Sequence, residues 1–99
     1  MVLHKGMNAT NKKVTLNQSE FTIVCNANPN RTTLIISNGE IAGRNAWLFF
    51  GNIRDAQAGC GYFLKAQGIP WKMDSDPPYI GSVCGISVAS DIDVAILEY

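Results

Sequence analysis

The segment that most constrains this 99-residue chain is a corner at residues 28–31, with the sequence Asn-Pro-Asn-Arg. Pro29 fixes its own φ and holds Asn28 in an extended conformation, so no helix can run through the segment. Asn30 is a residue type that adopts turn conformations and hydrogen-bonds locally. The β-branched and aliphatic residues from 32 to 37 are typical of a half-buried strand. We therefore expect a sharp turn between two strands, in which Arg31 donates hydrogen bonds to backbone carbonyls.

Short strand-like stretches recur along the whole chain, with turn signals about every 8 to 12 residues. The only helical rival is a short segment near residues 54–58, which glycines soon end. Such a chain must stack or close its sheet to hide apolar faces and edges. The predicted fold is all-β, a small β-sandwich or jelly roll of about eight short antiparallel strands. The expected strands lie at residues 13–17, 20–27, 32–38, 45–53, 62–66, 71–73, 81–88 and 93–99.

The length allows a single hydrophobic core, so we assign residues 13–99 to one β-sandwich domain. Residues 1–12 have neither a strand period nor a helix period, and we expect them to be an arm that orders on a partner. No secretory signal is expected, because residues 1–11 lack an apolar run of the needed length. No stretch approaches the ~20 apolar residues of a membrane span, so no membrane contact is expected.

The strand period of two assigns side chains to faces. Residues 45–53 are apolar on both faces, as expected for a strand inside a sandwich or at an interface. Three further segments each place a set of residues on one face: Phe21, Ile23, Cys25 and Ala27; Cys84, Ile86 and Val88; and Val94, Ile96 and Glu98.

The formal net charge is +0, from eight basic and eight acidic residues. A dedicated nucleic-acid binder would normally carry a basic face, so no nucleic-acid partner is expected. A chain without net charge also lacks the self-repulsion that keeps proteins apart. We therefore expect a homo-oligomer, either a dimer or a trimer.

Catalytic chemistry is sparse in the sequence. His4 is the only histidine, and a nucleophile–histidine pair would need a second group to hold it in place. Cys25, Cys60 and Cys84 lie far apart without the close spacing of a zinc site, and we expect all three to be buried free thiols in a reducing compartment. We predict no enzymatic activity, no bound metal and no cofactor.

The aromatic residues favour packing and interface roles over stacking on nucleic acid, because the basic residues around them are dispersed and balanced by acids. We expect Trp47, Phe49, Trp71 and Tyr79 to contact a partner, together with Leu3, His4 and Lys5 of the arm. An alternative is that exposed Trp71 and Tyr79 form a platform on which a cell-surface glycan stacks.

The order of motifs resembles that of small virion proteins of tailed bacteriophages, over about residues 13–99. The most distinctive match is the corner, Ala27 to Arg31. The other matching segments are Val14-Thr15-Leu16, Leu34 to Asn38, Gly68-Ile69, Pro77 to Val83 with Ile86, and Val94 to Tyr99.

The resemblance implies a capsid decoration or cement protein that binds the major capsid protein and stabilises the head shell. It also covers head-fibre bases and other head–tail accessories. The alternative function is a tail or fibre module or a head–tail accessory module, which could bind a glycan or the host surface. The implied location is the capsid surface of a virion, after synthesis in the host cytoplasm.

Overall fold

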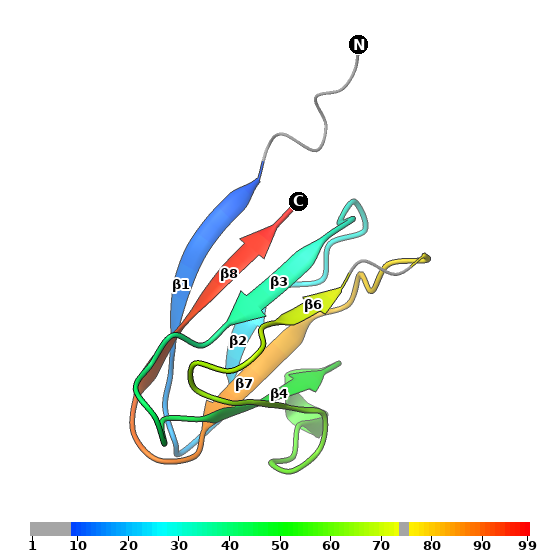
Figure 1. The fold of residues 1–99 in the computed structure, drawn as a ribbon. Helices are drawn as coiled ribbons and strands as arrows, with labels where there is room; N and C mark the ends of the chain where they lie inside the picture. Colours follow the sequence, from blue (N-terminus) through cyan, green and yellow to red (C-terminus); the bar gives the residue numbers. More distant parts are fainter. Residues whose placement is uncertain (1–8, 74–75) are drawn as a thin grey trace.

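The computed structural model describes residues 9–73 and 76–99. Within them, eight strands form two four-stranded antiparallel sheets that pack on each other (Figure 1). This confirms the predicted all-β sandwich. The strands are β1 (Thr10–Leu16), β2 (Thr22–Cys25), β3 (Leu34–Ser37), β4 (Ala46–Phe50), β5 (Tyr62–Leu64), β6 (Trp71–Met73), β7 (Val83–Ser87) and β8 (Ile92–Glu98).

The strand order identifies the sandwich as a jelly roll. One sheet has the order β1-β8-β3-β6 and the other β2-β7-β4-β5. The pairs are nested, because the first strand pairs with the last, the second with the seventh, the third with the sixth and the fourth with the fifth. A long antiparallel ribbon rolled over on itself gives this order, and the roll hides one face of each half.

The core lies between the two sheets, where alternate side chains of each strand point inward. Gly85 of β7 is required for this packing. A Cβ atom there would lie 3.0 Å from Leu16 Cδ1 and 3.3 Å from Leu48 Cδ2. The largest apolar side chains of the core are fully buried: Leu16, Val24, Leu34, Ile36, Leu48, Leu64, Val83, Ile92, Val94 and Ile96.

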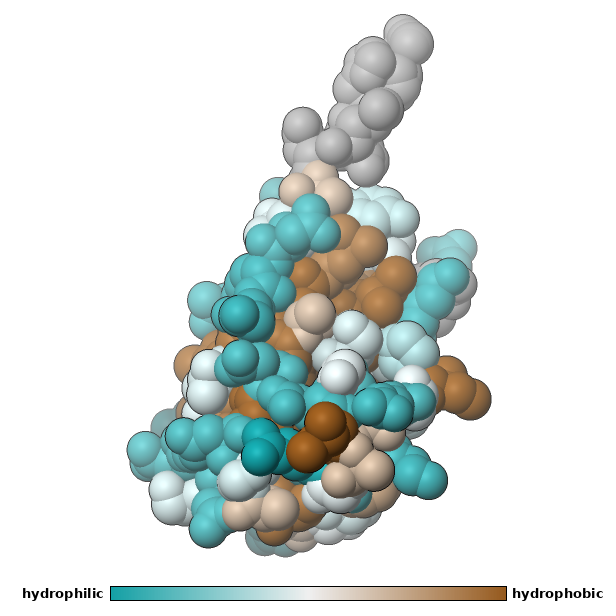
Figure 2. Space-filling view, turned by 60° about the vertical axis from the view of Figure 1, so that its left-hand side comes forward, coloured by the Kyte–Doolittle hydropathy of each residue, from teal (hydrophilic) through white to brown (hydrophobic). Residues whose placement is uncertain are grey.

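The sandwich begins at Thr10, before the predicted boundary at residue 13. Residues 10–12 continue β1 and pair with residues 96–98 of β8. Their polar side chains are exposed and show no alternation, so the sequence gives no sign of a pairing that the backbone makes. Figure 2 shows a hydrophilic band running down from the start of the described chain. Residues 1–8 of the predicted arm lie outside the described residues.

The faces of β2 differ from the prediction that Ile23 and Cys25 lie on the same side. The register with β7 shifts between these two residues, as at a β-bulge. The shift places Cys25 inside with Val24, both buried, while Ile23 is 45% exposed on the outside. A bulge inserts one residue into a strand, and a strict period of two cannot anticipate it.

The predicted rival helix near residues 54–58 is a single 3-10 turn, η2 (Ile53–Asp55). The Asn52 side chain caps it by accepting a hydrogen bond from the Arg54 amide, and Ala56 is already extended. The turn lies between β4 and β5, and its Ile53 is partly exposed.

The approach of the β5 hairpin to β4 predicts a large effect of Gly61→Ala. Gly61 has φ +105°, and an added Cβ would lie 2.0 Å from the Leu48 carbonyl oxygen. Gly59 has φ +90°, but a Cβ atom added there would have no atom within 4 Å. Gly59→Ala therefore measures the backbone strain alone, without a steric clash. We expect a loss in unfolding free energy of about 1 kcal/mol for Gly59→Ala and of roughly 3 kcal/mol or more for Gly61→Ala, measured by urea denaturation. Equal losses would show that β4 and β5 do not approach so closely.

Candidate functional site

The corner at residues 28–31 is a turn closed by backbone and side-chain hydrogen bonds. The Arg31 amide donates to the Asn28 carbonyl at 3.1 Å, and the Asn30 amide donates to Asn28 Oδ1 at 3.0 Å. The Asn28 amide donates to the Ile80 carbonyl at 2.8 Å, which ties the turn to the segment before β7. The predicted turn between two strands is present, and Asn28 makes most of its contacts.

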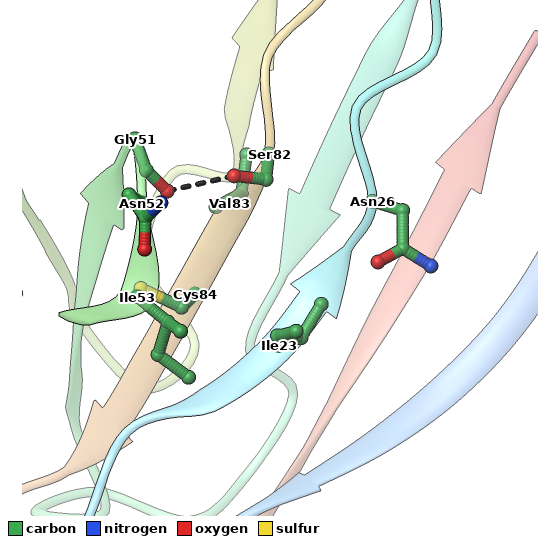
Figure 3. A pocket seen from close by; sticks show the side chains of 8 residues that line it. All are labelled: Ile23, Asn26, Gly51, Asn52, Ile53, Ser82, Val83 and Cys84. Atoms are coloured by element: carbon green, nitrogen blue, oxygen red, sulfur yellow. Dashed lines mark hydrogen bonds between the residues drawn. The ribbon is translucent and has the colours of Figure 1, made fainter.

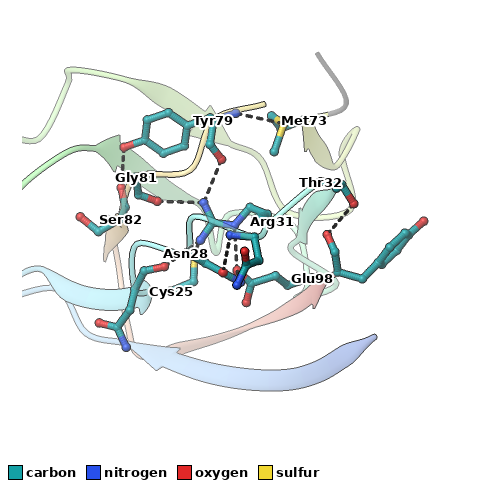
Figure 4. A network of polar contacts seen from close by, with 12 residues as sticks. Cys25, Asn28, Arg31, Thr32, Met73, Tyr79, Gly81, Ser82 and Glu98 are labelled. Carbon is teal, nitrogen blue, oxygen red and sulfur yellow. Dashed lines mark hydrogen bonds and ion pairs between the residues drawn. The ribbon is translucent and has the colours of Figure 1, made fainter. Parts of the chain in front are cut away.

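Arg31 is 1% exposed and lies at one end of the sandwich (Figure 4). Its Nη1 donates to the carbonyls of Tyr79 (3.0 Å) and Gly81 (2.8 Å), and Nη2 donates to the Asn26 carbonyl (2.7 Å). These are the hydrogen bonds to backbone carbonyls expected from the sequence. Nη2 also lies 3.5 Å from Cys25 Sγ.

The charge of Arg31 is matched by Glu98, which sequence reasoning missed as its partner. Arg31 Nε donates to Glu98 Oε2 at 2.7 Å, and the Glu98 side chain is 14% exposed. Arginine has five N–H donors, and the five contacts with Cys25, Asn26, Tyr79, Gly81 and Glu98 account for all of them. The guanidinium has no donor left for a ligand, so we interpret the corner as structural.

A second feature lies on the outside of the β2-β7-β4-β5 sheet, which we call the outer apolar face. Its residues alternate with core residues along each strand, and none of them belongs to the core cluster. Ring contacts join Trp47 to Phe63 at 5.0 Å and Phe21 to Phe49 at 6.4 Å between centroids. The face consists of Phe21, Ile23, Trp47, Phe49, Phe63, Cys84 and Ile86.

The outside of the other sheet differs in charge. It carries Lys13 and Asp93, whose Nζ and Oδ2 atoms lie 3.9 Å apart, and the exposed Lys72. The outer apolar face has no charged side chain, and its most exposed residues are Ile23 (45%) and Phe63 (42%). A contiguous apolar patch of this kind is often a functional contact surface.

The predicted interface residues separate into three groups. Trp47 and Phe49 lie on the outer apolar face. Trp71 and Tyr79 are half-buried and pack against the core and against the Phe50 ring, with ring centroids 4.7 and 5.8 Å away, so they are less exposed than expected. Leu3, His4 and Lys5 lie outside the described residues.

A small open cavity of about 210 Å³ lies at one end of the outer apolar face (Figure 3). Ile23, Ile53 and Cys84 form its apolar side. Its polar side includes Ser82, whose Oγ donates to the Gly51 carbonyl at 2.7 Å. None of the eight lining residues carries a charge, so the cavity offers shape and apolar contact rather than acid–base chemistry.

The cysteines differ from the prediction that all three are buried. Cys25 and Cys84 are buried free thiols, whereas Cys60 is exposed in the loop before β5. Burial raises the pKa of Cys25, although the Arg31 charge acts in the opposite direction, and burial also raises the pKa of Cys84. Both buried thiols are therefore neutral at pH 7 and poor nucleophiles.

Among residues 9–73 and 76–99, no group of three His, Cys, Asp or Glu side chains could hold a metal ion. In the same part of the chain, no helix has the length and apolar character needed to cross a membrane. Comparisons of the chain with protein-family models, with curated proteins and with solved structures found no significant match.

The Arg31 network predicts that Arg31→Ala is strongly destabilising. The change removes the cation that pairs with Glu98 and the donor that three carbonyls share, and breaking a buried ion pair costs about 3–5 kcal/mol. Arg44→Ala is the matched control, because Arg44 Nη1 lies 3.7 Å from Glu40 Oε1 on a half-exposed surface, where such pairs contribute about 0–1 kcal/mol. Urea denaturation measures both losses. If Arg31→Ala costs no more than Arg44→Ala, the corner is not a structural centre.

The burial of two thiols predicts selective labelling. In the folded protein at pH 7.5, a thiol reagent should modify Cys60 rapidly and leave Cys25 and Cys84 unmodified, because they are buried and protonated. In denaturant all three should react. Cys60→Ser should remove the rapid phase and leave the melting temperature within about 2 °C. Rapid labelling of three thiols in the folded protein would contradict the burial of Cys25 and Cys84.

Proposed function

We propose that the chain is a non-enzymatic structural protein of a phage virion, which binds the head shell as a decoration or cement protein and stabilises it. The observation that carries this proposal is the outer apolar face. It is a whole sheet face without charge on a domain whose net charge is +0. Such a face is costly in water and favours assembly into a larger particle.

The chemistry of the described residues supports a binding role over catalysis. The best-organised polar group, Arg31, uses every donor to hold the fold together. The buried thiols are neutral, and the cavity next to Cys84 has no charged lining residue. An acid–base pair or an activated nucleophile would require at least two groups with tuned pKa values facing one space.

In the proposed mechanism, oligomers of the chain bridge neighbouring subunits of the major capsid protein. A standard protein contact buries ~800 Å² per partner, and many copies acting on one shell strengthen weak individual contacts. The resemblance at residues 27–31 supports this role and the virion location. The jelly roll itself is shared by capsid and lectin domains, so the fold alone does not choose between them.

The alternative, a tail or fibre module that binds a glycan, has less support, because Trp71 and Tyr79 are half-buried. The rings of Trp71 and Tyr79 pack against the core, and the Tyr79 hydroxyl donates to the Ser82 carbonyl at 2.7 Å. A sugar would need an aromatic face open to solvent to stack on. We therefore favour the shell protein.

The test is the copy number of the chain in purified phage particles, measured by quantitative mass spectrometry. A decoration protein should be present in hundreds of copies, because it follows the lattice of the shell. A handful of copies would support the tail or fibre role instead. Absence from the particles would overturn the virion role altogether.

A variant without residues 1–8 tests the arm separately, because the described sandwich starts with β1 at Thr10. We expect this variant to keep its circular dichroism spectrum and melting temperature but to lose binding to shells prepared without the chain. The full-length chain is the matched control. Unchanged shell binding would show that the arm is not the contact.

A further inference from the structure

We propose that the outer apolar face is covered by a second copy of this chain, in a two-fold dimer whose axis runs parallel to the strands. The inference rests on the proposed assembly role and names the partner of that face. The symmetry is isologous, so each contact between two different residues occurs twice.

The most exposed residues of the face lie at its opposite edges. Ile23 is on β2 and Phe63 on β5, and these strands are the two edges of the sheet. A two-fold axis parallel to the strands places β2 of one copy over β5 of the other. The registers place Ile23 level with Cys84 and Phe49, and Phe63 level with Ile86 and Trp47, two residues further along the strands. Phe63 then lies over the partner's β2 at the level of Phe21, and both exposed edges of the face are covered.

The two central strands of the face complement each other in size. The β4 strand carries the large rings of Trp47 and Phe49, and β7 carries the smaller Ile86 and Cys84 at the same levels. The parallel axis sets Trp47 against the partner's Ile86 and Phe49 against the partner's Cys84. An axis perpendicular to the strands would set rings against rings and leave gaps elsewhere, which costs packing contacts.

Charges at the rim favour the same axis. Glu20 precedes β2 and Lys65 follows β5, and because the strands between them alternate in direction, both exposed residues lie at one end of the sheet. The parallel axis brings Glu20 next to the partner's Lys65, twice per dimer. The perpendicular axis moves Glu20 to the opposite end, away from Lys65. Charge complementarity therefore fits a second copy in this one orientation.

The size of the face predicts a weak dimer. Four strands of about five residues present a flat area of roughly 300 Å². A standard interface buries ~800 Å² per partner, so the rim must supply the rest. We expect a dissociation constant on the order of micromolar, and many copies on one particle can strengthen such weak binding.

Association of two copies by pairing of their β1 edge strands is disfavoured, because Lys12 and Lys13 lie on this exposed strand.

Sedimentation of the purified full-length chain over roughly 1–100 μM tests the proposal. The wild type should pass from monomer to dimer in this range. Ile23→Glu and Phe63→Glu should each raise the dissociation constant at least about tenfold while circular dichroism shows a folded chain, since both sites are partly exposed in the monomer. Ile69→Glu is the matched control, because Ile69 is 80% exposed and lies outside the face, and it should leave the dimer unchanged.

A charge swap tests the axis. Glu20→Lys and Lys65→Glu should each weaken the dimer, and the double variant should restore it to within about threefold of the wild type. A chain that stays monomeric to 100 μM, a dimer insensitive to Ile23→Glu, or a double variant without rescue would overturn the proposal. A monomeric chain that still occurs in hundreds of copies per particle would retain the virion role and assign the face to the shell.

Discussion

The structure depends on one buried cation, Arg31, and on the groups that surround it. The residue joins the two sheets at one end of the jelly roll, because Asn26 and Gly81 flank β2 and β7 of one sheet while Glu98 belongs to β8 of the other. A buried charge is costly unless it is paired and hydrogen-bonded. The Asn-Pro-Asn turn positions Arg31 so that each of its N–H donors has an acceptor. The turn, the buried charge and the packing of the two sheets therefore depend on one another.

The corner at residues 28–31 and the outer apolar face have different roles in the molecule. The corner is polar, buried and internally satisfied, and it holds the two sheets together. The outer apolar face lies on the outside of its sheet and carries no charge, and Ile23 and Phe63 are its most exposed residues. Because the Arg31 network holds the two sheets together at one end, the outer apolar face is available for association and is not needed for the stability of the fold.

Much of the architecture was predictable, because turns and alternating apolar residues mark strands directly. All eight strands occur where the spacing placed them. The β2 bulge and the inward packing of Trp71 were not predictable, since both arise from pairing between strands distant in sequence. For Arg31 a signal existed: the alternation places Glu98 on the same face as Val94 and Ile96. A carboxylate among core positions calls for a buried cation, and Arg31 is that cation.

The register of β1 with β8 has a mechanical consequence. Thr10 lies opposite Glu98, so the start of the first strand and the end of the last lie together at the Arg31 end of the sandwich. Tension applied to these two points would separate the pair one hydrogen bond at a time, starting at Glu98, instead of shearing all the bonds together. The hydrogen bonds that join Tyr99 to Thr32 and Thr33, together with the ion pair between Glu98 and Arg31, are thus among the first contacts to carry the load.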